Sequence, residues 1–245
     1  RRAGARVEDD GLVKIPPALV EEAIEAAPEA LTIFDRTGAE AMRLEGRNTY
    51  YGTGPTTPLV YDPYTGERRE TDTPDIENAA LICDALENID FVMSMGISGG
   101  SDPAVHGIKP EMIDRFDFKA MLTHTTKPNV FLAYSLQGLI DIHDMAAAVV
   151  GGAHELQERP FVIHYSEPTS PLIHSSVPLE KLLFCADKAM PVIYVGGPLM
   201  GGTAPVTLAG QLVVSNAECL SGLVIHQLKA QGSPFIYGAG GNPLD

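Results

Sequence analysis

The sequence is poor in cysteine and in basic residues. Its three cysteines, Cys83, Cys185 and Cys219, are far apart and form no CxxC pair or zinc-type spacing. Each lies in an apolar stretch of helical character, which predicts buried, reduced thiols and a cytoplasmic protein. Lys and Arg number 17 against 32 Asp and Glu, a formal net charge of −15. This balance argues against nucleic-acid binding, which requires clustered Lys and Arg. It is compatible with a cationic ligand, or simply with a solvated acidic surface.

Long apolar runs and several familiar motifs are absent as well. The sequence has no signal-peptide pattern and no run of about 18 apolar residues, so we expect a soluble protein without a membrane-spanning helix. It contains no GxGxxG, Walker, GxSxG or HExxH motif, which argues against a serine hydrolase among other classes. No cluster of His, Asp and Glu has metal-ligand spacing, so no directly bound metal is predicted.

The most informative feature is a repeated type of segment. Four times a proline leads directly into an apolar β-type segment that ends in tyrosine, serine or glycine, and a fifth segment fits without the proline. The segments are residues 91–98, 128–135, 160–167, 191–197 and 234–240. Proline is tolerated at the first residue of a strand, and near-continuous apolar runs are typical of strands buried on both faces. The segments begin about 30 to 43 residues apart with helical stretches between them, which is the length of a βα unit.

Repeated βα units predict an α/β fold, a TIM-type (β/α) barrel whose chemistry lies at the C-terminal ends of the strands. Residues 74–245 supply about five units, whereas closure of the barrel needs eight strands. Residues 1–73 lack this repeat and instead show a helix, short strands and turns, which predicts an N-terminal α+β cap. The chain starts at Arg1 rather than Met and stops at Asp245, just after the fifth segment. We therefore expect a fragment of a longer protein.

Local signals predict the other elements. Thr73 is the expected N-cap of a helix with Pro74 at its first position. The remaining expected helices cover residues 18–27, 109–125, 138–156, 179–188 and 207–231, and short strands are expected at 31–34, 48–51 and 59–61.

The predicted strand ends carry the candidate site residues. Glu167 ends its segment and could act as a general base or as the counter-charge to a cation, although a solvated loop acid is the alternative. The four proline-led segments each carry one tyrosine: Tyr134, Tyr165, Tyr194 and Tyr237. If some of them converge, they could form an aromatic cage for a quaternary or protonated amine. Alternatively, they pack between the barrel and its helices.

Three serines and one histidine complete the candidate substrate site. Ser98, Ser135 and Ser166 lie at segment ends and could donate hydrogen bonds to a ligand carboxylate. His164 lies in mid-strand beside Tyr165, where a hydrogen-bonded core role is the alternative to a ligand contact.

A glycine-rich stretch, residues 196–210, follows the fourth segment. Its Gly201, Gly202 and Thr203 could bring backbone N–H groups to a phosphate-bearing ligand or cofactor. A mobile loop, or close packing of a helix on a strand, is the alternative.

Several longer blocks resemble a known family. The blocks are residues 190–194 (MPVIY), 201–210 (GGTAPVTLAG), 216–224 (NAECLSGLV), 167–172 (EPTSPL) and 15–20 (IPPALV). They resemble the trimethylamine methyltransferase family of corrinoid-dependent methyltransferases, and the resemblance runs through nearly the whole chain. It implies a TIM-type barrel that transfers a methyl group from a methylated amine to the Co(I) centre of a separate corrinoid (cobalamin) protein.

The positions of the candidate residues, taken with the activity that the resemblance implies, suggest site roles as hypotheses. Glu167 and Tyr165 are expected to act at the reacting methyl group. The expected substrate contacts are Ser98, Tyr134, Ser135, His164, Ser166 and Tyr237. The stretch with Gly201, Gly202 and Thr203 is expected either to accept the edge of the corrin or to leave room for the corrinoid protein to dock. The substrate would be trimethylamine or a quaternary amine such as glycine betaine. Trimethylamine-specific members carry pyrrolysine at a position that aligns beyond Asp245. A homo-oligomer is possible.

Two other functions remain open. The first is an unrelated TIM-barrel enzyme that binds a phosphorylated substrate at the glycine-rich stretch, although no predicted strand ends in the Lys that such enzymes often use. The second is a non-catalytic barrel fragment.

Overall fold

The computed structural model describes residues 1–244 and divides into two compact units. One unit contains Arg1–Glu29 and the chain from Tyr165 onward, and the other contains Ala30–His164. The predicted division into a cap (1–73) and a partial barrel (74–245) is of a different kind and stays a prediction.

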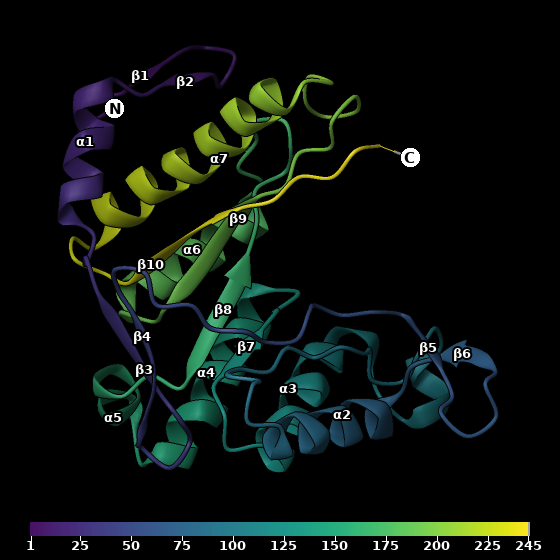
Figure 1. The fold of residues 1–245 in the computed structure, drawn as a ribbon. Coiled ribbons are helices and arrows are strands. Elements are labelled where there is room, and N and C mark those ends of the chain that lie inside the picture. Colours follow the sequence, from purple (N-terminus) through teal and green to yellow (C-terminus); the bar gives the residue numbers. More distant parts are fainter. Residues whose placement is uncertain (245) are drawn as a thin grey trace. The chain divides into compact units, whose positions relative to one another are not determined.

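The unit formed by residues 30–164 begins with two antiparallel hairpins and continues with helices around a short parallel strand (Figure 1). Its elements are β3 (Leu31–Phe34), β4 (Glu40–Leu44), β5 (Leu59–Tyr61), β6 (Arg68–Glu70), α2 (Thr73–Ala85), the 3-10 helices η1 (Pro103–His106) and η2 (Pro110–Met112), α3 (Ile113–His124), β7 (Asn129–Phe131), α4 (Leu136–Val150), α5 (Ala153–Glu158) and the first part of β8 (Val162–Ser166). Helices α2 and α3 lie side by side.

The other unit packs three helices with two long parallel strands. Its elements are β1 (Arg6–Val7), β2 (Val13–Lys14), α1 (Pro17–Ala26), the end of β8, α6 (Ser176–Asp187), β9 (Val192–Gly196), α7 (Leu208–Lys229) and β10 (Phe235–Ala239). Helix α7 contacts α1, α6, β9 and β10 (Figure 1). Leu19 and Ala23 of α1 are buried against Leu223 and Val224 of α7.

Four of the five predicted strand segments form one parallel sheet, in the order β10-β9-β8-β7. Each strand begins one or two residues after its proline, as predicted. Val92 continues this order, because it bridges Asn129 of β7 in parallel and exchanges backbone hydrogen bonds with its neighbours Pro128 and Val130. The parallel neighbours therefore follow one another in chain order, which is the order of a βα repeat rather than of a doubly wound sheet.

The predicted strand 91–98 is wrong beyond its first residues. Side chains replace the ladder partners, because Met93 N donates to Thr53 Oγ1 at 2.7 Å and Thr57 Oγ1 donates to the carbonyl of Met95. Met95 has a left-handed backbone, with φ of 52°, which no strand accommodates. The predicted strand 48–51 is also wrong, since only the adjacent Gly52 bridges Phe91.

Two differences from the predicted helices have a clear local cause, while others are shifts of a few residues, such as α6 beginning at Ser176 rather than Leu179. The N-cap of α2 is Asp72 rather than Thr73, because the Asp72 carboxylate accepts the Asp75 N–H in a capping box. The predicted helix 138–156 is two helices, since α4 ends at Gly151, whose φ of 98° is left-handed, and α5 begins after Gly152.

Helix α7 is long and apolar enough to cross a membrane, by length and composition alone. A core helix passes the same test, and α7 carries the buried polar residues Gln211, Ser215, Glu218 and His226. These polar side chains indicate a helix that packs inside a protein.

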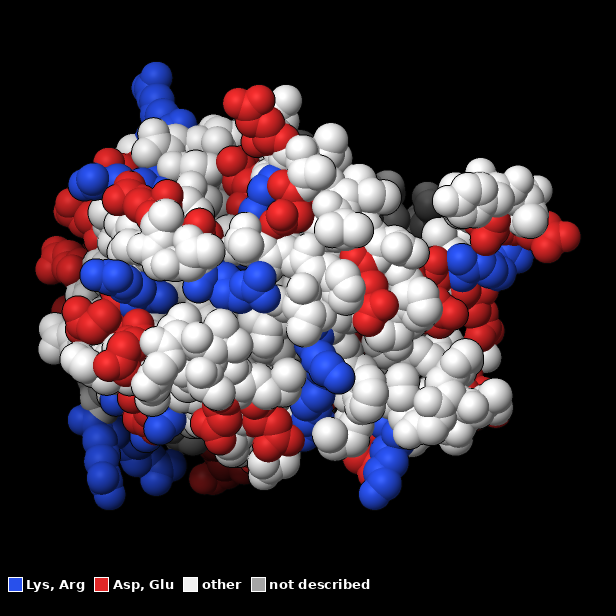
Figure 2. Space-filling view, turned by 90° about the horizontal axis from the view of Figure 1, so that it is seen from below, with Lys and Arg blue, Asp and Glu red and all other residues white. Residues whose placement is uncertain are grey.

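The three cysteines are buried and free, as predicted. Burial raises the pKa of all three thiols, and that of Cys219 to about 11. On the face of the molecule shown in Figure 2, acidic and basic side chains are interspersed and separated by uncharged surface.

Candidate functional site

In the unit of residues 30–164, polar groups gather after the end of strand β7 and after Phe91 and Val92, the two residues that form single bridges beside it. Thr56 and Ser94 share a hydrogen bond of 2.9 Å between their hydroxyls, and Thr56 also hydrogen-bonds the Tyr134 side chain. Tyr134 is 44% exposed. With Asp114 and Asp117 these residues line a small cavity of about 10 Å³, room for about one water molecule.

Two carboxylates of α3 hold the segments that follow these strands. Asp117 Oδ1 accepts the backbone N–H of Ser98 at 2.7 Å, and Asp114 Oδ2 accepts that of Tyr134 at 2.8 Å. Sequence analysis named Ser98 and Tyr134 as substrate residues, and the structure places both against one helix. It did not single out the two aspartates.

The two aspartates differ in their charge partners. Asp114 pairs with Arg115 at 2.9 Å, and Arg115 also pairs with Asp141 of α4 at 2.8 Å. No ion pair to Asp117 occurs among residues 1–244. Burial, followed by the charge of Asp114, raises the pKa of Asp117 to about 6, against the opposing effect of the hydrogen bonds from Ser98. Burial and the same two carboxylates raise the pKa of Tyr134 to about 12.

The other two predicted residues of this unit are engaged elsewhere. The Ser135 hydroxyl caps α4 by accepting the Gly138 N–H at 3.0 Å, so it serves the helix. The His164 ring is fully buried and packs on Phe131 at a centroid distance of 5.3 Å. That environment fits the alternative core role.

The second group of predicted residues lies where β8 ends, in the other unit. Tyr165 is half-buried, and burial together with the charge and hydrogen bond of Glu167 raises the pKa of its hydroxyl. Glu167 is exposed. The buried hydroxyl of Ser166 has no hydrogen-bond partner within the described residues, which leaves it free for a ligand that reaches this strand end.

The loop that follows Glu167 is fixed to α7 by a buried carboxylate. Glu218 is fully buried and accepts hydrogen bonds from Ser170 Oγ and Leu172 N, both at 2.9 Å. A Cβ added to Gly196, at the end of β9, would lie 2.9 Å from Glu218 Oε2. Glycine at this position therefore leaves room for the carboxylate.

A partly buried hydrogen-bond chain adds a second attachment of the same loop. Ser221 Oγ donates to the Glu218 carbonyl at 3.0 Å, so it accepts from His174 Nε2 at 2.7 Å. His174 Nδ1 then carries no proton and accepts from the Tyr194 hydroxyl at 2.8 Å. Burial lowers the pKa of His174, which agrees with this neutral ring.

The four tyrosines do not converge into one aromatic cage. Tyr194 is fully buried, and a Cβ on Gly222 of α7 would lie 2.4 Å from its ring. Tyr237 pairs with Tyr194 in the sheet register, so both side chains leave the sheet on the α7 side. The Tyr237 hydroxyl donates to Asn216 of α7 at 2.9 Å. The packing alternative describes Tyr194, whereas Tyr237 is 47% exposed and reaches α7 through its hydroxyl.

The glycine-rich stretch uses its own N–H groups. Gly201 N donates to the Ala204 carbonyl at 3.0 Å and Gly202 N to the Leu199 carbonyl at 3.0 Å, while Thr203 Oγ1 accepts from Leu199 N at 2.9 Å. In this conformation neither glycine offers an N–H to an anion. The phosphate alternative loses its main support, and the loop remains an exposed turn after β9.

Comparison with known proteins shows the family of this chain. The family model described as "Trimethylamine methyltransferase (MTTB)" matches residues 1–242. The chain belongs to the trimethylamine methyltransferase family. The resemblance stated from the sequence blocks is thereby confirmed.

Members of this family with related sequences include bacterial and archaeal proteins. "Trimethylamine methyltransferase MttB" of Desulfitobacterium hafniense (strain DSM 10664 / DCB-2) is 33% identical over 99% of this chain and 48% of that protein. "Glycine betaine methyltransferase" of D. hafniense (strain Y51) is 28% identical over 98% of this chain and 48% of that protein. "Trimethylamine methyltransferase MttB" of Methanosarcina thermophila is 30% identical over 97% of this chain and 49% of that protein. The chain thus spans about half the length of the relatives it matches.

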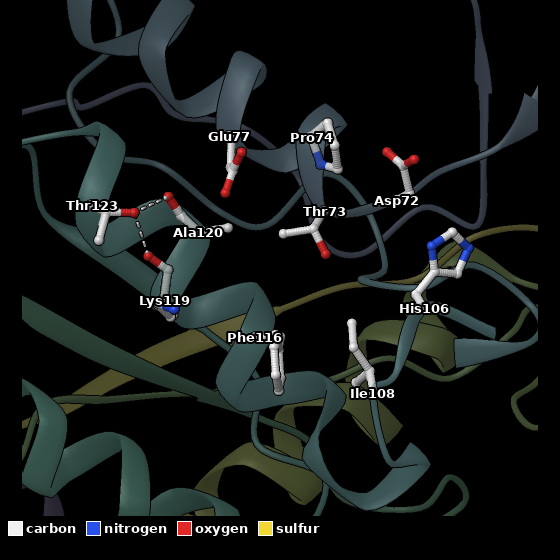
Figure 3. Close-up of a pocket in the computed structure, with 10 residues that line it drawn as sticks. All are labelled: Asp72, Thr73, Pro74, Glu77, His106, Ile108, Phe116, Lys119, Ala120 and Thr123. Carbon is white, nitrogen blue, oxygen red and sulfur yellow. Dashed lines mark hydrogen bonds between the residues drawn. The ribbon is translucent and has the colours of Figure 1, made fainter. Parts of the chain in front are cut away.

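A larger cavity in this trimethylamine methyltransferase family chain lies between helices, away from the residues above. It measures about 320 Å³ and is lined by the start of α2, by α3 and by the η1 region (Figure 3). Glu77, Lys119 and His106 bring groups of both signs to its wall. Within residues 1–244, no group of three His, Cys, Asp or Glu side chains could hold a metal ion.

Asp114, Asp117 and Glu218 were not among the predicted residues, although the sequence carries a signal for the two aspartates. Asp114 and Asp117 are three residues apart and share a helix face with Phe118 and Met121 at i+4, which the 3.6-residue period directs inward. A carboxylate on an inward face needs donors, and strand-end N–H groups supply them.

Proposed function

We propose that the protein containing this chain transfers a methyl group from a methylated amine to the cobalt of a corrinoid protein. The observation that carries the proposal is the family match, which extends over residues 1–242 and therefore over both units. Relatives named for trimethylamine and for glycine betaine support a methylated amine as the substrate class. The chain-order succession of parallel neighbours supports a TIM-type barrel.

Methyl transfer to cobalt requires the protein mainly to orient the substrate. The cobalt of the partner's corrinoid supplies the nucleophile that accepts the methyl group. A quaternary amine leaves as a neutral tertiary amine, so no general acid is required at the nitrogen. The chain's residues then have to bind the cation, align its C–N bond and exclude water.

Two places in the chain suit a methylated ammonium group. Glu167 with Tyr165 offers an exposed carboxylate beside an aromatic ring. Asp117 with Tyr134 offers a buried carboxylate beside a partly exposed ring in the other unit. The free hydroxyl of Ser166 suits the carboxylate of a betaine.

The turn after β9 fits the approach of a corrin held by a partner. Gly201 is exposed, and a Cβ added to it would meet no atom within 4 Å. A surface without bulky side chains accommodates a flat ring edge. A cytoplasmic location and a homo-oligomeric state stay predictions.

The test uses the full-length protein mixed with its reduced corrinoid protein. The visible spectrum of the corrinoid protein reports methylation while trimethylamine and glycine betaine are offered separately. Methylation by either amine supports the proposal, and the amine that works names the substrate. No methylation by either amine, nor by other tertiary and quaternary methylamines, would contradict it.

Variants of the full-length protein test the residues. Glu167→Gln and Tyr165→Phe should each lower kcat/KM about tenfold or more, since each removes a contact to the cation or its counter-charge. Glu180→Gln on α6 is the control, because Glu180 is an exposed acid of the same unit. If both site variants match the control, the site does not include Glu167 and Tyr165.

A further inference from the structure

The strongest unassigned feature is the way α3 reaches the strand ends through Asp117. The Asp117 side chain is 5% exposed, yet it accepts a 2.7 Å hydrogen bond from the backbone of Ser98. Ser98 belongs to a segment without ladder partners, because Met95 turns the chain out of the sheet. Side-chain acceptors therefore take the place of sheet pairing here: Asp117 accepts the N–H of Ser98, and Thr71 Oγ1 accepts that of the adjacent Ile97 at 3.0 Å.

Asp114 provides an internal comparison for Asp117. Asp114 makes the equivalent bond to Tyr134 N, but Arg115 neutralises it at 2.9 Å. Its Oδ2 also lies where a Cβ on Gly138 would be, at 2.3 Å, so it is enclosed by the first turn of α4. Asp114 thus has a structural role, and its charge is balanced by the ion pair with Arg115.

Asp117, in contrast, has no cationic side chain paired with it within the described residues. It lines the small cavity together with Tyr134, Thr56 and Ser94, and no ion pair to it occurs in the described part of the chain. A buried carboxylate without a counter-ion is costly, and a cation that arrives beside it removes that cost. Tyr134, which shares the cavity and is partly exposed, is the surface such a cation would touch.

We propose that Asp117 is a positioning residue for the amine substrate, which fixes Ser98 by its hydrogen bond and makes the surface around Tyr134 selective for cations. This inference rests on the proposed function for its substrate class, a tertiary ammonium or quaternary amine. Asp117 itself acts through Ser98 and Tyr134 and need not touch the reacting methyl group.

The ionisation of Asp117 agrees with this role. Its pKa is raised to about 6 by burial and by Asp114, so the carboxylate is charged at pH 7.5 and half-protonated near pH 6. The titratable groups that face it are Asp114 on its own helix and Tyr134 after β7, while Ser98 contributes neutral donors. The buried residues of α2, which packs on α3, are Ile76, Ala80 and Cys83.

Three variants of the full-length protein separate the hydrogen bond from the charge. Asp117→Asn keeps an oxygen that accepts from Ser98 but removes the charge, whereas Asp117→Ala removes both. Glu111→Gln is the control, since Glu111 is an exposed acid just before α3. Hydrogen exchange followed by mass spectrometry, on peptides covering residues 94–101, reports how well the Ser98 N–H and its neighbours are protected from exchange.

The expected results differ between the variants. Asp117→Ala should speed exchange of the 94–101 peptide about tenfold or more, and Asp117→Asn should restore most of the protection. Asp117→Asn should raise KM for the amine about tenfold with little change in kcat. The native protein is expected to show a rise of KM as the pH falls below 6, and Asp117→Asn should flatten that rise. Calorimetric titration with tetramethylammonium should show the same weakening without turnover.

Each part of the proposal can fail on its own. Unchanged exchange in Asp117→Ala would overturn the positioning role, and unchanged affinity for tetramethylammonium in Asp117→Asn would overturn the cation role. A native protein that does not bind tetramethylammonium also overturns the cation role. If the probe binds and responds to the variants while no amine is methylated, the proposed function fails and the role of Asp117 stands.

Discussion

Replacement of His226 should make the unit that contains α7 less sensitive to acid. The His226 ring is fully buried on α7 and packs edge-on against Phe235 at 5.3 Å. Its Nδ1 lies 3.3 Å from the Gln227 side-chain amide, and its Nε2 has no hydrogen-bond partner within residues 1–244. Nothing there stabilises a charge, so burial lowers the pKa of His226 to about 4.

The sign and size of the effect follow from linkage. The unfolded chain takes up a proton on this ring near pH 6.5, but the folded chain does so only near pH 4. Between these values the unfolded state binds more protons, so the stabilisation present above pH 6.5 is lost as the pH falls. The loss attributable to His226 is about 2 kcal/mol at pH 5 and about 3 kcal/mol at pH 4. Asp117 acts in the opposite direction, since its raised pKa favours the folded state as pH falls through 6.

Differences between variants isolate the contribution of His226 from the other groups. Native-state hydrogen exchange of α7 peptides should give an opening free energy that falls between pH 7.5 and pH 5, and His226→Leu should remove about 2 kcal/mol of that fall. His154→Leu is the matched control, because His154 is exposed on α5. An identical pH dependence in His226→Leu and in the native protein would refute the reasoning.

Two further substitutions test contacts of α7. Glu218→Ala should release the loop at Leu172 and raise its sensitivity to limited proteolysis severalfold, because a buried acceptor of two hydrogen bonds is lost; unchanged proteolysis would count against the attachment. Gly222→Ala should lower stability by about 1–3 kcal/mol despite the better helix propensity of alanine, since its Cβ would meet the Tyr194 ring at 2.4 Å. Thermal unfolding compared with Gly54→Ala, where the Cβ meets no atom within 4 Å, checks this.

The strand starts could be predicted from the sequence because proline acts locally. Pro128, Pro160, Pro191 and Pro234 each precede a strand of the parallel sheet by one or two residues, as the pattern indicated. The apolar run at 91–98 shows the same local preference but leaves the sheet after Val92. There the hydroxyls of the distant segment 53–57 compete for the backbone, and no local pattern reveals such partners.

The candidate site was predictable in part for the same reason. Residues at strand ends, such as Tyr134 and Glu167, follow from strand position alone. Asp114 fixes the backbone of Tyr134, and Glu218 fixes the loop that follows Glu167. Both carboxylates lie in helices, where a charged residue is most often solvated. The direction of Tyr237 depends on register with Tyr194, which the sequence does not state.

The chemistry of the buried thiols has a practical consequence for labelling. Cys83, Cys185 and Cys219 are shielded, and their raised pKa values keep the reactive thiolate scarce at neutral pH. A cysteine introduced on the surface of this chain, for example at exposed Tyr64, would react with a maleimide dye far faster than these three. Fluorescent probes can therefore be attached to this chain without first removing its own cysteines.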